Sequence, residues 1–194
     1  ITGIDGAGAT NTITGPNVAS SWAVNTTDAG TLTPTGASGA TNFSNIANLT
    51  GGSAADTFVL ADNVGLTGTI DGTSSSGNIL DYSAYTVTAV VVDLSAGTAT
   101  NLGGVGNIQK LIAGQAANTF TASTTQNNTF EFPTNPTAAS TVTGDAVRVD
   151  TISKTSGANT WAITADDSGT VGNITFTDMK NLLGGSGNDS FTFN

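Results

Sequence analysis

The sequence NIANLTGGSAADTF at residues 45–58 decides the fold, because the chain repeats it twice. It returns as NIQKLIAGQAANTF at residues 107–120 and as DMKNLLGGSGNDSF at residues 178–191, each time without a gap. The three copies begin 62 and 71 residues apart. Internal similarity with a spacing of this size indicates a repeat architecture, in which each unit packs against its neighbours.

A second block of the sequence follows the same repeat. Residues 22–32 (WAVNTTDAGTL) match residues 161–171 (WAITADDSGTV), and residues 89–99 (AVVVDLSAGTA) are the middle counterpart. The turn sequence TGIDG at residues 2–6 also resembles GTIDG at residues 68–72, whereas the last third of the chain lacks it. We therefore predict three diverged units of about 66 residues, 1–66, 67–128 and 129–194, in one continuous structure.

The pattern within a unit is typical of short strands. Apolar runs such as those at residues 58–60, 79–80 and 90–92 recur roughly every 11 residues, and Gly, Asn, Asp or Ser residues separate them. No stretch keeps a 3.6-residue apolar period beyond two turns. The sequence predicts an all-β fold.

Two β architectures compete for this pattern. In a parallel β-solenoid, a unit of this length supplies about three coils. An immunoglobulin-like sandwich needs about 100 residues and often a buried Trp in each copy. The unit is too short for that sandwich, and the middle copy has Ala89 where the others have Trp22 and Trp161. We expect the parallel β-solenoid (β-helix or β-roll-like).

The composition argues against several classes of function. The chain has 14 acidic and 4 basic residues, a net charge of −10, and neither His nor Cys. Few cations are available for nucleic acid, and no run of about 18 apolar residues predicts membrane insertion. Disulfides, zinc sites, thiol nucleophiles and Ser-His-Asp triads need residues that the chain lacks. The chain begins with Ile1 rather than Met, from which we expect a processed or excised sequence.

One loop resembles a known calcium motif. Residues 184–192 (GGSGNDSFT) fit the pattern G-G-x-G-x-D-x-U-x of the RTX calcium β-roll. The chain is therefore similar to large repetitive bacterial surface proteins and adhesins with degenerate RTX-like (haemolysin-type calcium-binding) repeats. The resemblance implies calcium as a ligand and the carboxylates of Asp189 and Asp56 as its metal residues.

The chain departs from the RTX family in one respect. Each unit carries a single loop, whereas Ca²⁺ prefers 6 to 8 oxygen ligands, which tandem RTX loops supply together. The middle copy also has Asn118 in place of the Asp. The alternative interpretation is a Gly turn that leads into a strand with a buried Phe.

An enzyme would have to use carboxylates and the few cations. Asp166 and Asp167 are adjacent, so in a strand they would point to opposite faces, and we interpret them as a turn. Arg148 and Asp150 are the one hint of the groups used by polysaccharide-active β-helix enzymes. We predict no catalytic residues and no firm cofactor.

Threonine pairs raise the question of ice binding, since flat solenoids with rows of Thr can order water. The pairs Thr86/Thr88 and Thr119/Thr121 have the spacing that places two hydroxyls on one face. They occupy non-equivalent positions of the repeat, so we expect no continuous column and attribute them to the β propensity of Thr.

These observations favour a non-catalytic structural module. We expect a secreted or cell-surface bacterial protein that acts as an adhesin stalk, a matrix component or a self-assembling filament component. Its expected partners are a second copy bound head-to-tail, neighbouring repeats of the same protein, or surface polysaccharide. The alternatives are an RTX-like calcium-binding module and a polysaccharide-active β-helix enzyme.

Overall fold

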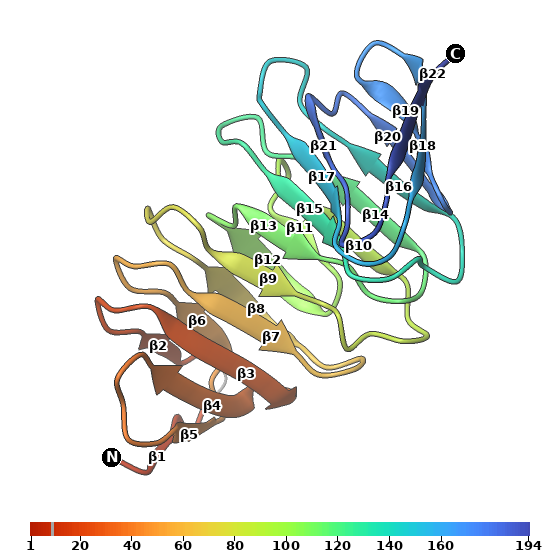
Figure 1. Ribbon diagram of the computed structural model, residues 1–194. Helices are drawn as coiled ribbons and strands as arrows, with labels where there is room; N and C mark the ends of the chain where they lie inside the picture. Colours follow the sequence, from red (N-terminus) through yellow and green to blue (C-terminus); the bar gives the residue numbers. More distant parts are fainter. Residues whose placement is uncertain (9) are drawn as a thin grey trace.

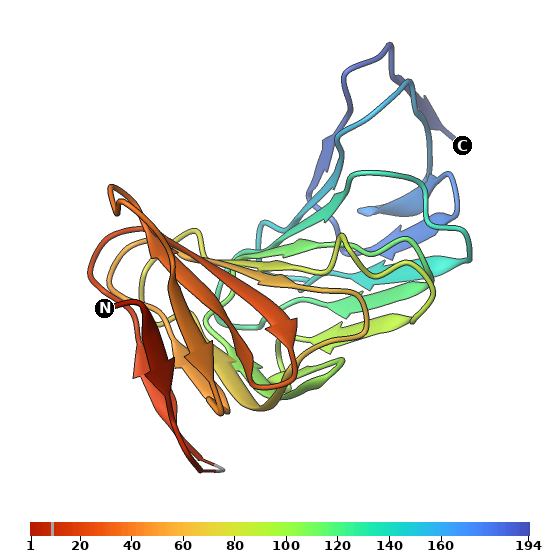
Figure 2. The ribbon, with the colours of Figure 1, turned by 90° about the horizontal axis from the view of Figure 1, so that it is seen from below.

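The computed structural model describes residues 1–8 and 10–194, and it confirms the all-β prediction. Within these residues it contains strands and no helix, so it also contains no helix able to span a membrane. The strands form two sheets that face each other along one axis, with the two termini at opposite ends (Figures 1 and 2). The prediction of parallel strands is likewise confirmed, although both sheets also contain antiparallel pairs.

The ten-stranded sheet contains, in spatial order, β1 (Gly3–Asp5), β5 (Thr41–Ser44), β4 (Ala29–Pro34), β3 (Ser20–Thr26), β7 (Thr57–Leu60), β9 (Ile79–Asp81), β13 (Lys110–Ile112), β15 (Thr129–Phe132), β17 (Thr151–Lys154) and β21 (Asn181–Leu183). The twelve-stranded sheet contains β2 (Thr12–Thr14), β6 (Asn48–Thr50), β8 (Leu66–Asp71), β12 (Leu102–Gly106), β11 (Thr98–Ala99), β10 (Val90–Asp93), β14 (Asn118–Thr121), β16 (Ser140–Thr143), β20 (Ile174–Thr177), β19 (Ser168–Val171), β18 (Thr160–Ala165) and β22 (Ser190–Phe193).

The chain alternates between the two sheets. From β6 to β10, for example, each strand lies in the opposite sheet from the one before it, and each crossing returns the chain beside an earlier strand in parallel. The alternation is interrupted by three antiparallel meanders, β3–β4–β5, β10–β11–β12 and β18–β19–β20, one in each repeat unit.

The unequal repeat spacing has a structural counterpart. Four strands, β6 to β9, separate the first two meanders, whereas five strands, β13 to β17, separate the second and third. Because the strands alternate between sheets, the first meander lies in the ten-stranded sheet and the other two lie in the twelve-stranded sheet. The nine residues by which 71 exceeds 62 thus accompany one additional crossing and set the sheet in which the next unit lies.

The core lies between the sheets in continuous columns of inward side chains. In the ten-stranded sheet, consecutive register partners are all fully buried: Trp22, Phe58, Leu80, Leu111, Phe130 and Ile152. In the first and third units a Trp packs in the same way, with one Phe stacked on it and a second Phe edge-on. In the middle unit the position opposite the Phe belongs to Val92, which is the register partner of Phe120, rather than to Ala89.

The turns explain why Asn and Asp begin each copy of the repeat. Asn45, Asn107 and Asp178 all have a left-handed backbone, with φ of 55°, 56° and 56°. Short polar side chains tolerate this region better than other non-glycine residues. The residue after each of them, Ile46, Ile108 and Met179, is then buried. The same turn is therefore built in every unit.

Candidate functional site

The Gly-rich loops place their Asp or Asn side chain over the loop itself. Asp56 is fully buried, and its Oδ1 and Oδ2 accept the backbone N–H groups of Ser20 and Gly52, each at 2.9 Å. A Cβ atom at Gly51 would lie 2.6 Å from Asp56 Oδ2, so the glycine leaves room for the carboxylate. The conserved spacing of Gly and Asp within this loop thus has a local structural reason.

The two other copies use the same position in related ways. Asn118 accepts the N–H of Gly114 at 3.1 Å and donates to the carbonyl of Ala116 at 2.8 Å. Asp189 Oδ1 accepts the N–H of Asn159 at 2.9 Å and its side-chain amide at 2.8 Å. Ser20 and Asn159 both lie two residues before the Trp of their unit, so Asp56 and Asp189 make equivalent contacts.

These side chains belong to a wider set of polar residues at the starts of strands. Asp56 N–H donates to Asn78 Oδ1 at 2.9 Å, and Asn78 N–H donates in turn to Gln109 Oε1 at 2.8 Å. Further along the same sheet, Asn128 N–H donates to Asp150 Oδ1 at 2.6 Å. A buried backbone N–H needs such a partner, so the set stabilises the turns where the chain enters each strand.

The structure does not bring Asp56 and Asp189 together. Asp56 precedes β7 in the ten-stranded sheet, and Asp189 precedes β22 at the far end of the twelve-stranded sheet. Among the described residues, no three acidic, His or Cys side chains converge into a group that could hold a metal ion. A calcium shell at either loop would therefore need backbone carbonyls or water for most of its 6 to 8 oxygens.

The loop interpretation also predicts a buried Phe after each Gly turn, and this holds in two copies. Phe58 and Phe120 are fully buried. Phe191 is 45% exposed, because β22 is the outermost strand of its sheet and no further strand covers the ring.

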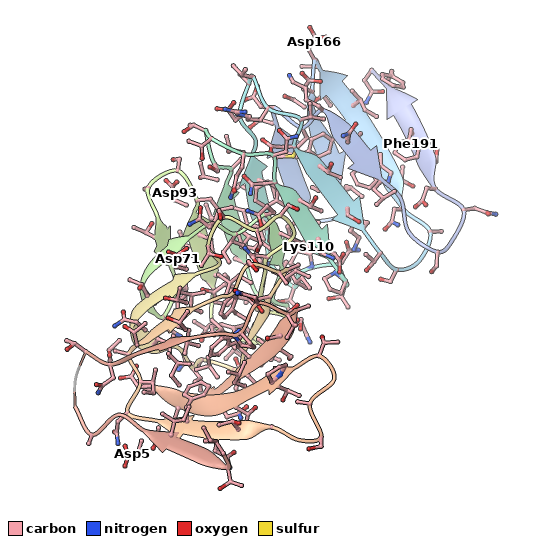
Figure 3. The ribbon with its side chains drawn as sticks, turned by 90° about the vertical axis from the view of Figure 1, so that its left-hand side faces the viewer. Asp5, Asp71, Asp93, Lys110, Asp166 and Phe191 are labelled. Atoms are coloured by element: carbon pink, nitrogen blue, oxygen red, sulfur yellow. The ribbon has the colours of Figure 1, made fainter. Side chains whose placement is uncertain are left out.

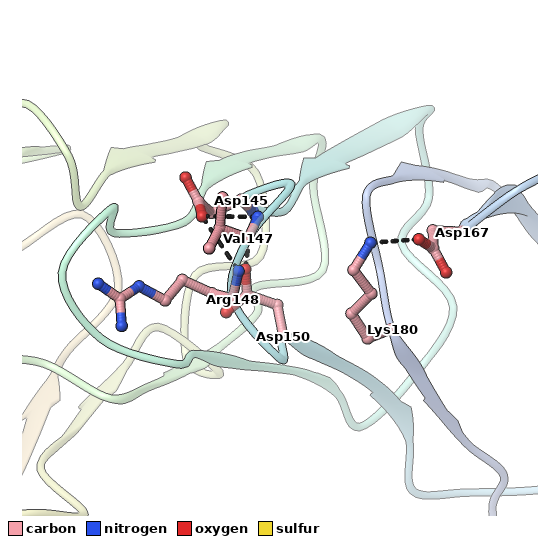
Figure 4. A network of polar contacts seen from close by, with 6 residues as sticks. All are labelled: Asp145, Val147, Arg148, Asp150, Asp167 and Lys180. Carbon is pink, nitrogen blue, oxygen red and sulfur yellow. Dashed lines mark hydrogen bonds and ion pairs between the residues drawn. The ribbon is translucent and has the colours of Figure 1, made fainter.

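Arg148 and Asp150 lie close in sequence, but their charged groups serve different contacts (Figure 4). Asp150 is buried and accepts the N–H groups of Asn128 and Asp145, while Arg148 Nε donates to the carbonyl of Thr124 at 3.0 Å. Burial raises the pKa of the Asp150 carboxyl above its usual value, although its two N–H donors oppose the shift. No ion pair joins the two side chains within the described part of the chain.

Asp166 and Asp167 form the turn between β18 and β19, which confirms the turn interpretation. Asp167 has a φ of 55° and pairs with Lys180 (Figure 4). Its counterpart in the first unit, Asp28, has a φ of 59° and accepts the N–H and hydroxyl of Thr67 at 2.7 and 2.8 Å. Both aspartates therefore serve as turn residues with local hydrogen-bond partners.

Sequence reasoning missed one buried cation. Lys154 is 2% exposed, and burial lowers the pKa of its amine. Its inward direction follows from the alternation of β17, in which Ile152 and Lys154 share one side. A Lys at an inward position of an alternating strand is the signal that the sequence offered.

Comparisons of this chain with protein-family models, curated proteins and solved structures find no match. Arguments about function therefore rest on the residues and contacts described above.

Proposed function

We propose that the chain is a parallel β-solenoid of three diverged repeats that serves as a non-catalytic structural module. Its setting would be a secreted or cell-surface bacterial protein, as an adhesin stalk, a matrix component or a filament component. The observation that carries this proposal is the alternation of the strands between two sheets along one axis. Each crossing adds one rung of core, as coils do in a solenoid.

The candidate polar groups support a structural role. The carboxylates of Asp56 and Asp189 hold backbone N–H groups of the turns, and Asp28 and Asp167 hold local partners. The acidic charge and the lack of Cys suit a chain that works outside the cell. Neither feature requires a substrate.

The open ends support self-association. β1 and β2 lie at one end of the two sheets, and β21 and β22 lie at the other (Figure 1). Phe191 and Asp5 mark these opposite ends in Figure 3. Leu183 and Phe193 are 57% and 80% exposed at the second end. Exposed strand edges with apolar side chains are templates for pairing with another chain.

The spacing at the two ends also matches. The central residues of β1 and β2, Ile4 and Ile13, are nine residues apart, as are Leu182 and Phe191 on β21 and β22. At each end the first strand belongs to the ten-stranded sheet and the second to the twelve-stranded sheet. A second copy placed head-to-tail would therefore continue both sheets, and a contact of this kind grows into filaments.

Negative-stain electron microscopy of the purified chain tests the proposal. We expect filaments whose width matches one rod, and we expect Phe193→Asp to shorten them because it places a charge at the contact. Val147→Asp is the matched control, since Val147 is 85% exposed in a loop between strands. Monodisperse single particles at high concentration, or equal shortening by both variants, would contradict self-association.

An RTX-like calcium-binding module is the alternative, favoured by the loop at residues 184–192. Oδ1 of Asp189 accepts two hydrogen bonds, and Oδ2 has no hydrogen-bond partner among the described residues. Calorimetric titration with Ca²⁺ alone, repeated with Asp189→Asn and with Asp56→Asn, tests this alternative. Binding that Asp189→Asn abolishes would support it, and no heat at millimolar Ca²⁺ would refute it.

A further inference from the structure

The outer face of the twelve-stranded sheet carries an ordered group of threonines. The strands β14, β16 and β20 are neighbours, and each contains the sequence Thr-x-Thr. Their register places equivalent threonines side by side in two columns, and β19 adds one more threonine beside the first column. We call this group the threonine array: Thr119, Thr141, Thr175 and Thr170 in one column, and Thr121, Thr143 and Thr177 in the other.

This finding corrects the expectation from sequence. Thr119 and Thr121 do stand in continuous columns, because the strands beside β14 come from residues 140–143 and 174–177 rather than from repeat-equivalent positions. Thr86 and Thr88, by contrast, lie outside any strand.

The array points to solvent on a rigid support. The residues between the threonine pairs, Phe120, Val142 and Phe176, are buried in the core, so the threonines face outward. Six of the seven threonines are exposed, and Thr121 is half-buried. A β-branched side chain has restricted rotamers, so hydroxyls and methyls on adjacent hydrogen-bonded strands hold a regular arrangement.

The hydroxyls of the array are free. None of the seven has a hydrogen-bond partner within the part of the chain that the structure describes. Elsewhere threonine hydroxyls are occupied: those of Thr67 and Thr86 bind the carboxylates of Asp28 and Asp62, each at 2.8 Å. The array therefore offers unoccupied donors and acceptors in a group.

The array is also uncharged, although the chain carries a net charge of −10. Its first column continues into Val91 on one side and Ala162 on the other, which are apolar. A charged residue, Asp93, stands only at one border, beside Thr121. The outer face of the ten-stranded sheet differs, because it carries Asp81, Lys110 and Glu131 in neighbouring strands.

The geometry points to a partner with a repeating lattice of neutral hydrogen-bonding groups. Adjacent strands are about 4.8 Å apart, and residues i and i+2 of a strand are about 6.7 Å apart. The array is thus a rectangular grid of hydroxyl and methyl groups that extends about 14 Å across four strands. Methyl groups order the water around them, and hydroxyls at regular intervals anchor that water.

We propose that the threonine array is an ice-binding surface. Its uncharged grid suits the neutral, regularly spaced water molecules of an ice surface, whereas a charged face would hold its own hydration shell. Sugar-binding faces use aromatic platforms, and the aromatic residues of these strands, Phe120 and Phe176, point into the core. The surface lies on the side of the sheet rather than at its ends, so this inference is independent of the proposed self-association.

Ice-affinity partition and ice-recrystallisation inhibition of the full chain test the proposal. We expect the protein to enter slowly growing ice and to inhibit recrystallisation at micromolar concentration. Thr141→Tyr places a bulky ring at the centre of the array and should reduce both effects at least tenfold. Thr141 is exposed, so the melting temperature should stay close to that of the unchanged protein.

Thr151→Tyr is the matched control, because Thr151 is an outward threonine on β17 in the other sheet. It should leave the effects on ice unchanged. Exclusion of the unchanged protein from ice would overturn the proposal, as would equal losses in the two variants. Binding to crystalline cellulose without any effect on ice would also overturn it, in favour of a polysaccharide partner.

Discussion

Asp56 accepts the backbone N–H of Ser20 at 2.9 Å, across 36 residues of sequence, and both residues are buried. The contact joins the Gly-rich loop of the first unit to the start of the strand that carries Trp22. Asp189 and Asn159 repeat the arrangement in the third unit. The carboxylate of the repeat motif is therefore a fastening between adjacent coils, and its removal has calculable consequences.

Replacing Asp56 should destabilise the fold in a graded way. Asp56→Ala leaves the N–H groups of Ser20 and Gly52 without partners and should lower the free energy of unfolding by about 2–4 kcal/mol. Asp56→Asn should cost less, because Asn118 holds a loop N–H from the equivalent position. Urea denaturation followed by tryptophan fluorescence measures both. Asp81→Ala is the control on a more exposed carboxylate, and a loss of equal size there would contradict the prediction.

The indole nitrogens give a second prediction. Nε1 of Trp22 and Nε1 of Trp161 are buried and have no hydrogen-bond partner among the described residues. Trp161→Phe removes this unsatisfied donor and should cost about 1 kcal/mol or less, whereas Trp161→Ala should cost about 3–5 kcal/mol through the cavity. Thermal melting followed by circular dichroism distinguishes these outcomes. Similar losses in the two variants would show that the indole itself is required.

Lys154 makes stability depend on pH. Burial lowers the pKa of its amine in the folded state below the ordinary value of 10.5. The unfolded chain then binds more protons between the two pKa values, so stability should rise with pH in the window below 10.5 and be lost as pH falls through the lowered pKa. Lys154→Met should remove this rise and stabilise the protein at pH 7 by about 1 kcal/mol.

Lys110→Met is the control for this prediction. Lys110 is a partly exposed lysine of the same sheet and pairs with Glu131 at 2.6 Å. Its replacement should leave the pH dependence intact and change stability by less than about 1 kcal/mol. An unchanged pH profile in Lys154→Met would contradict the assignment.

Asp93, at the border of the threonine array, should titrate below its usual range. A hydrogen bond from the Ser95 hydroxyl is the main cause of the lowered pKa, and the backbone N–H of Ala96 adds to it. Ser95→Ala should raise the pKa of Asp93 toward 3.8, which NMR titration of the carboxyl carbon measures. The stability that this carboxylate contributes is present above pH 3.8 and should be lost as pH falls through the lowered pKa. A Ser95→Ala chain with an unchanged Asp93 pKa would refute this account.

Much of the local structure could be predicted from the sequence alone. The repeat, the all-β class, the turn at Asp166 and Asp167, and the burial of Phe58 and Phe120 all follow from residue type and spacing. These features depend on contacts within a unit or on the backbone preferences of a few residues. They are therefore encoded in short stretches of the chain.

Only the tertiary structure decided which strands lie side by side. Thr119, Thr141 and Thr175 are separated by 22 and 34 residues, and they form a column because the chain crosses between the sheets before it returns beside each earlier strand. Crossing number also decides the sheet that receives each meander. Comparison of repeat units aligns residues that are alike, whereas a surface is made by residues that are neighbours, and in this fold the two sets differ. The sequence by itself determined the repeating element, and the packing of successive crossings on a shared core determined which faces those elements build.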